Sequence, residues 1–167
     1  STYNFAVSNN NEFKSIYLSK ASNLNTFHNY GSILKQLDGL TENVELKNIE
    51  AINSLTNLTP NFIRMDVEGH EVEILSSILD FIVKESKYPK ILFETHLSRY
   101  NKNHNLNDIF KKFYDLGYIA SMIGTSSENG IKFLQNKGYK MIKTIYSDGY
   151  KRGIFTDIDL LTLDTMV

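Results

Sequence analysis

Apolar and polar positions along the chain predict strands that are separated by helices. Alternation with a period of two is typical of a strand with one buried face. This period, or a short apolar run, predicts strands in the following ranges: 2–7, 12–19, 44–50, 61–67, 90–95 and 118–124. Residues 139–147 and 150–158 look like an antiparallel pair, because the dipeptide Asp148-Gly149 between them favours a hairpin turn.

The longest helical pattern covers residues 70–84. Its apolar residues recur every three or four positions, which predicts an amphipathic helix; they are Val72, Ile74, Leu75, Ile78, Leu79, Ile82 and Val83. Residues 106–116 predict a helix that ends at Gly117, and residues 127–137 predict another. Residues 51–58 could form one or two helical turns before Pro60 ends the segment. Residues 23–39 predict a loop that contains a short amphipathic segment.

This order of elements predicts an α/β fold. Parallel strands that are joined by helices and followed by an antiparallel pair describe a doubly wound sheet with a reversed edge. We expect a single domain over residues 1–167, since a chain of this length buries enough surface for one core.

Composition narrows the possible partners and location. The 18 basic and 19 acidic residues are interspersed, so no basic stripe predicts binding to nucleic acid. No apolar run approaches the roughly 20 residues that a membrane span needs, and the sequence contains no Cys. We therefore expect a soluble protein of a reducing compartment, by default the cytoplasm.

Ionisable side chains follow two of the predicted strands, at the edge where a doubly wound sheet carries its chemistry. Asp66 and Glu68 follow the strand in "NFIRMDVEGHE", and Glu94 and His96 end the next strand in "ILFETH". If the two strands are neighbours, all four side chains converge on one crevice. Because a histidine titrates near neutrality, His96 is the first candidate for a general base.

Each of these residues also has a structural explanation. Asp66 could be the N-cap of the following helix, and Glu68 could interact only with the helix dipole. His70 and Glu71 begin the helix, so capping explains them at least as well as catalysis. Oxygen-rich clusters suit Mg²⁺ or Mn²⁺, but the spacing alone does not predict a metal site, and we assign no metal ligands.

The block "NFIRMDVEGHEVEILSSI" resembles the signature of the FkbM-type S-adenosylmethionine-dependent methyltransferases, in which a strand runs into a D-x-E-G-x-E motif and a helix. The segments "YNFAVSNNNEFKSIYLS", "ILFETH" and "FKKFYDLGYIASMIG" are similar to other parts of the family, so the resemblance covers residues 3–124. It implies a Rossmann-like methyltransferase sheet and S-adenosylmethionine as the cofactor. It further implies that Asp66 faces the methyl group of the cofactor and that Val7 and Ser8 contact its adenine.

One part of the family pattern is missing from the sequence. The family opens with a strand and a Gly-rich turn of the D-x-G-x-N-x-G kind, and an acidic residue ends its second strand. The nine glycines of this chain are scattered, and nothing before "YNFAVS" supplies those strands. We therefore expect the C-terminal portion of the family's domain, truncated at its N-terminus.

These observations lead to one main hypothesis and two alternatives. The main hypothesis is a fragment of an S-adenosylmethionine-dependent O-methyltransferase, and the resemblance implies a sugar or another polyhydroxylated metabolite as the small-molecule or glycan acceptor. One alternative is a non-catalytic half-domain that associates through an exposed sheet edge. A weaker alternative is a metal-dependent hydrolase that uses the same acids. Methyl transfer from a sulfonium needs positioning and a base rather than a metal.

Overall fold

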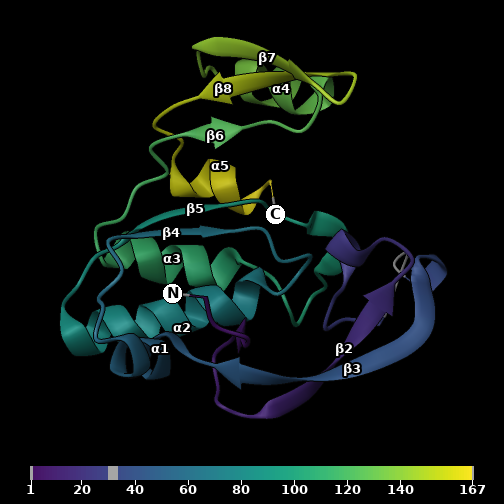
Figure 1. Cartoon of the computed structure of the whole chain (residues 1–167). Coiled ribbons are helices and arrows are strands. Elements are labelled where there is room, and N and C mark those ends of the chain that lie inside the picture. The colour runs from purple at the N-terminus through teal and green to yellow at the C-terminus, as the bar shows by residue number, and fades with distance from the viewer. Residues whose placement is uncertain (1, 30–33, 167) are drawn as a thin grey trace. The chain divides into compact units, whose positions relative to one another are not determined.

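The computed structural model describes residues 2–29 and 34–166. The chain divides into two compact units, Ser1–Asn105 and Leu106–Val167. Each unit contains its own helices and strands (Figure 1). The mixed α/β class that the sequence predicts is therefore confirmed.

The first unit contains a three-stranded sheet in the order β1-β3-β2. Its central strand β3 (Leu37–Lys47) runs parallel to β1 (Ala6–Val7) and antiparallel to β2 (Phe13–Ser19), and the long pair β2 and β3 lies side by side in Figure 1. Strand β2 lies where the sequence predicts it. Strand β3 begins seven residues earlier than predicted, at Leu37 rather than Val44, because backbone pairing with β2 extends it through a largely polar segment.

The second sheet of this unit places the two strands that precede the candidate site residues beside each other. Strand β4 (Phe62–Met65) pairs in parallel with β5 (Lys90–Phe93), and Met65 lies opposite Phe93. Helix α2 (Glu71–Glu85) connects the two strands. Both strands therefore end at the same edge, as the sequence predicts.

Helix α2 supplies most of the apolar core of the first unit. Its buried apolar residues are Ile74, Leu75, Ile78, Leu79, Phe81 and Ile82. Val83, which belongs to the predicted apolar pattern, is 71% exposed, and Phe81, which the pattern left out, is 2% exposed. Phe81 follows Ile78 by three positions and Ile74 by seven, so it belongs to the same helix face. Helix α1 (Ile49–Thr56) forms two turns that begin at the N-cap Asn48.

The second unit packs three helices and an antiparallel sheet around a core of its own. The helices are α3 (Asn107–Asp115), α4 (Glu128–Asn136) and α5 (Leu160–Asp164). The sheet has the order β6-β8-β7, with strands β6 (Ile123–Gly124), β7 (Lys143–Ser147) and β8 (Tyr150–Phe155). The buried core consists of Ile131, Leu134, Phe155, Ile158 and Leu163.

Three sequence predictions in the second unit are confirmed and two features differ. Helix α3 lies within the predicted range 106–116. The hairpin β7-β8 turns at Asp148 and Gly149, which both have positive φ angles as the tightest hairpin turns require. Helix α4 lies in the predicted range. Only Ile123 and Gly124 of residues 118–124 form a strand, and helix α5 has no counterpart in the prediction because its five residues are too short to show a period.

The described strands form three separate sheets rather than one. The parallel pair β4-β5 and its connecting helix are typical of an α/β fold. The Rossmann-like order of one continuous sheet, its N-terminal truncation and the single domain stay predictions. In the part of the chain that the structure describes, no helix combines the length and apolarity needed to cross a bilayer.

Candidate active site

A tight turn between β4 and α2 arranges the side chains that the sequence singles out. Glu68 and Gly69 both have positive φ angles, 51° and 103°, so the chain passes through left-handed conformations at two consecutive positions. The hydroxyl of Thr26 donates a hydrogen bond of 2.9 Å to the carbonyl of Glu68. Such a conformation is uncommon for a residue with a side chain, and it turns the Glu68 carboxylate toward the end of β5.

Gly69 is expected to tolerate no side chain. A Cβ atom at this position would lie 2.5 Å from Cβ and 2.8 Å from Cγ of Arg99, in addition to the strain at its positive φ angle. We expect Gly69→Ala to lower the free energy of unfolding by about 2 kcal/mol or more, measured by urea denaturation. Gly39→Ala is the matched control, because Gly39 has a φ of 85° and nothing within 4 Å of the added Cβ. Equal losses in both variants would contradict a role of the Arg99 contact.

The imidazole of His96 is held from one side by a buried carboxylate. Nδ1 of His96 donates to Oε1 of Glu71 over 2.5 Å, and the side chain of Glu71 is fully buried. The hydroxyl of Tyr100 donates to Oε2 of Glu71 over 2.9 Å, and the backbone N–H of Gly69 donates to Oε1 over 3.2 Å. Because both carboxylate oxygens are engaged, Glu71 fixes the tautomer and the orientation of His96.

The opposite ring nitrogen of His96 faces two further carboxylates. Nε2 lies 3.5 Å from Oε1 of Glu68 and 3.7 Å from Oδ1 of Asp66. Arg99 donates from Nη2 to Oε2 of Glu68 over 3.2 Å. The structure thus brings together three of the four predicted residues. The fourth, Glu94, is exposed, and among the described contacts it acts on His96 only through its charge.

This arrangement changes the protonation of the cluster. The hydrogen bond to Glu71 raises the pKa of His96, burial opposes the increase, and the charges of Glu71 and Glu68 add to it. Burial by itself would raise the pKa of Glu71, but the hydrogen bonds from His96 and Tyr100 and the charge of His96 together outweigh burial and lower it. Burial and the charge of Glu71 raise the pKa of Tyr100, which therefore stays a neutral donor. Glu71 and His96 form a carboxylate–imidazole pair whose other ring nitrogen faces Glu68 and Asp66.

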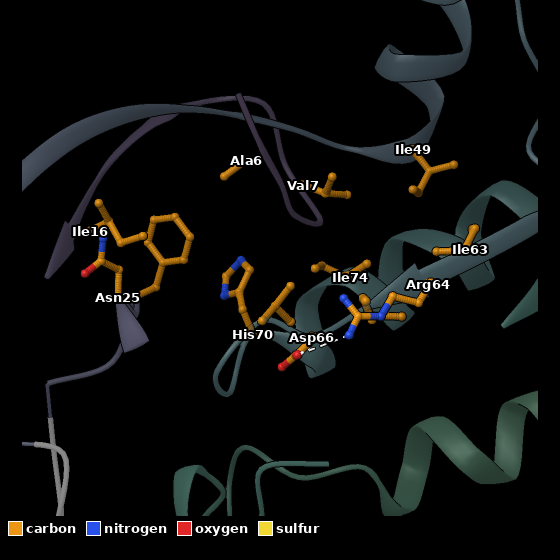
Figure 2. Close-up of a pocket in the computed structure, with 13 residues that line it drawn as sticks. Ala6, Val7, Ile16, Asn25, Ile49, Ile63, Arg64, Asp66, His70 and Ile74 are labelled. Atoms are coloured by element: carbon orange, nitrogen blue, oxygen red, sulfur yellow. Dashed lines mark hydrogen bonds and ion pairs between the residues drawn. The ribbon is translucent and has the colours of Figure 1, made fainter. Parts of the chain in front are cut away.

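A pocket of about 430 Å³ adjoins this cluster. Figure 2 shows Val7 and Ile49 on one side of the pocket and Asp66 and Arg64 on another, with a hydrogen bond of 3.3 Å from Arg64 to Asp66. Two of the three predicted cofactor contacts, Val7 and Asp66, thus line one cavity. The third, Ser8, is buried beside Val7, and its hydroxyl contacts Asn9 and His70.

One family model matches most of the chain. The sequence model described as "Methyltransferase FkbM domain" matches residues 1–120. The chain belongs to the FkbM methyltransferase family. Comparisons with curated proteins and with solved structures found no match.

The site of this FkbM methyltransferase domain contains residues that the sequence prediction missed. Glu71 was interpreted mainly as a helix start, yet it is the carboxylate that holds His96. Arg99 and Tyr100 follow β5 in a segment for which the sequence predicts no helix or strand, and both contact the cluster. A signal for Glu71 was present, because it is the last acid of the D-x-E-G-x-E motif. Asp66, Glu68 and His96 also each offer a ligand atom within 4.8 Å of the others, a spacing that could hold a divalent ion.

Proposed function

We propose that this FkbM methyltransferase domain transfers the methyl group of S-adenosylmethionine to a hydroxyl oxygen of a sugar or another polyhydroxylated metabolite. The single observation that carries the proposal is the orientation of His96. Its Nδ1 is bound by buried Glu71, and its Nε2 faces Asp66 at the rim of the pocket. An alcohol is a poor nucleophile until a base takes its proton, and this pair supplies the base.

The protein's residues have separate tasks in this reaction. S-adenosylmethionine supplies a methyl group that is already activated by its positive sulfur. His96 accepts the hydroxyl proton at Nε2, and Glu71 stabilises the resulting imidazolium through the hydrogen bond at Nδ1. Arg99 holds Glu68 in place, so that the acceptor can form a hydrogen bond with the Glu68 carboxylate. The acidic side chains therefore favour a methyl acceptor whose hydroxyl groups donate hydrogen bonds.

The pocket has a composition that fits S-adenosylmethionine. Val7, Ile49 and Ile63 provide apolar contacts for an adenine ring, and Asp66 places a carboxylate where a positive sulfur would be stabilised. The volume of about 430 Å³ lies in the usual range for small-molecule sites, roughly 300–1,000 Å³. Val7 and Asp66 are therefore proposed cofactor contacts, and Ser8 contributes through its backbone next to them.

The carboxylate of Asp66 is expected to discriminate between the charged cofactor and its neutral product. We expect Asp66→Asn to weaken binding of S-adenosylmethionine about 5-fold, because one exposed charge interaction is worth roughly 1 kcal/mol. Binding of S-adenosylhomocysteine, which lacks the positive charge, should change little. Isothermal titration of the wild type and the variant with both molecules measures this. Asp80→Asn on the exposed face of α2 is the matched control.

The same titration separates the proposal from its alternative. If the chain binds neither molecule at 1 mM (about −4 kcal/mol), the non-catalytic half-domain with an associating sheet edge is the better explanation. Among the described strands β4 pairs only with β5, and Phe62 is 54% exposed. Sedimentation velocity would then reveal self-association.

A further inference from the structure

A second group of ligand-type side chains lies in the first unit, separate from the His96 pair. We call His28, His70 and Glu73 the histidine–glutamate cluster. Each offers one ligand atom, and these atoms lie within 4.8 Å of one another. His70 is the N-cap of α2 and Glu73 lies in its first turn, so the two share a helix face, whereas His28 comes from the segment before β3. Both histidines are buried, at 8% and 2% exposure.

The spacing of the cluster fits a metal ion. Nδ1 of His70 lies 3.4 Å from Oε2 of Glu73. In a tetrahedral zinc site with bonds of about 2.0–2.2 Å, neighbouring ligand atoms are about 3.3–3.6 Å apart. A metal ion between His70 and Glu73 would therefore need little movement of either side chain.

Both ring nitrogens of His70 have polar neighbours. Nε2 lies 3.0 Å from the hydroxyl oxygen of Ser8. Nδ1 faces the Glu73 carboxylate at 3.4 Å, and within residues 2–29 and 34–166 this buried atom has no hydrogen-bond partner. In the tautomer that carries its proton on Nε2, the lone pair of Nδ1 points toward the carboxylate, and a cation between the two atoms would satisfy both.

The cluster has the outer support that metal sites usually show. Ser8 orients the ring of His70 from the far nitrogen. His104 lies 3.1 Å from each oxygen of Glu73 through its Nε2 and so orients the carboxylate. A hydrogen bond to the backbone of Gly69 orients His28. Such partners fix ligand geometry and contribute to affinity.

We propose that His28, His70 and Glu73 bind a transition-metal dication of the zinc class. Two imidazoles and one carboxylate are donors that suit Zn²⁺, whereas Mg²⁺ prefers oxygen ligands only. The site joins the segment before β3 to the start of α2, next to the turn that carries Glu68. It does not contain His96, so metal binding can be measured apart from the His96 pair, whereas His70 also lines the pocket.

The protonation states of the ligands agree with this role. Burial lowers the pKa of His70 to about 4, against the opposing charge of Glu73. The pKa of Glu73 is about 2, because the hydrogen bond from His104 and the charge of His70 outweigh burial. At neutral pH the imidazole is therefore neutral and the carboxylate ionised, which are the forms that bind metals.

The test is a titration of the EDTA-treated, dialysed chain with Zn²⁺ in competition with a chromophoric chelator. We expect one Zn²⁺ per chain with a Kd below about 1 µM, and a rise in Tm with Zn²⁺ that Mg²⁺ does not reproduce. Co²⁺ in place of Zn²⁺ should give a visible absorption band typical of four-coordinate cobalt. Absence of saturable Zn²⁺ binding up to 100 µM would overturn the proposal.

Variants assign the ion to this cluster rather than to the His96 pair. We expect His28→Gln and Glu73→Gln each to weaken Zn²⁺ binding at least 100-fold, and His104→Gln to weaken it about 10-fold. His96→Gln is the matched control, because His96 belongs to the other group of possible ligands, and it should bind as the wild type does. Loss of binding in His96→Gln together with normal binding in Glu73→Gln would overturn the proposal. If a variant fails to fold by circular dichroism, ¹⁵N imidazole spectra of the wild type decide: Zn²⁺ must shift His28 and His70, and a shift of His96 alone would contradict the assignment.

Discussion

Replacing His96 with Asn is expected to lower the rate of methyl transfer by about 10²–10⁴-fold, the usual contribution of a general base. Asn keeps a polar side chain but cannot take up a proton at neutral pH. The affinity for S-adenosylmethionine should change little, because His96 does not line the pocket. The measurement is release of S-adenosylhomocysteine with a panel of methyl glycosides, using the best acceptor. An unchanged rate in His96→Asn would exclude His96 as the base.

Glu71→Gln tests the pair through its pH dependence. The Glu71 carboxylate raises the pKa of His96, so its removal should lower that pKa. The rate rises with pH as His96 loses its proton, and the midpoint of this rise should therefore move to lower pH in the variant while the maximal rate falls. A pH titration followed by the ¹H–¹⁵N spectrum of the His96 ring measures the same change in pKa in the absence of a methyl acceptor. The control is Glu85→Gln at the exposed end of α2, and a midpoint unchanged by Glu71→Gln would contradict the positioning role.

Acidification from pH 7 to pH 4 is expected to remove about 3 kcal/mol of stability from the metal-free protein through His70 alone. Burial lowers the pKa of His70 from 6.5 to about 4, and the charges of Lys14 and His28 also act against protonation. Between these values the unfolded chain binds a proton that the folded chain does not, so stability falls as the pH falls. Glu73 adds to the loss below pH 4.5, because its pKa in the folded state is about 2.

Protonation of two other histidines changes the stability in the opposite direction. The contribution of His70 therefore has to be measured as the difference in stability between the wild type and a variant. The raised pKa values of His96 and His104 stabilise the folded state below pH 6.5 and cease to do so as the pH rises through their folded values. Comparing the wild type with His70→Gln in urea, with EDTA present, cancels these contributions. The stability advantage of the wild type should shrink from pH 7 to pH 4. An imidazole resonance of His70 that titrates near pH 6.5 would contradict the prediction.

Local pattern was sufficient for most elements of this chain. Helix α2 and strands β2, β4 and β5 lie within a few residues of the predicted ranges. The sequence of each has a clear hydrophobic period and is followed by residues that end a helix or strand. Strand β3 was underestimated, since its first seven residues are held by pairing with β2 rather than by apolar side chains. Helix α5 was missed, since five residues do not show a helical period.

The candidate site was predictable in outline but not in its contacts. Two strands that end in ionisable residues predict one crevice if they are neighbours, and the pairing of β4 with β5 makes them so. The sequence could not show that Glu71 rather than Asp66 holds His96, because the side-chain directions depend on the left-handed turn at Glu68 and Gly69. The histidine–glutamate cluster was invisible for a similar reason: His28 lies 42 residues before His70 in the chain, and only folding brings them together.

The sequence by itself determined the family, the α/β class and the strand ends that carry the acids, because these depend on local period and on a contiguous motif. Only the tertiary structure decided which carboxylate binds which histidine. Those contacts join residues that are 25 or more positions apart, and small differences in backbone angle decide which side chains lie within hydrogen-bond distance.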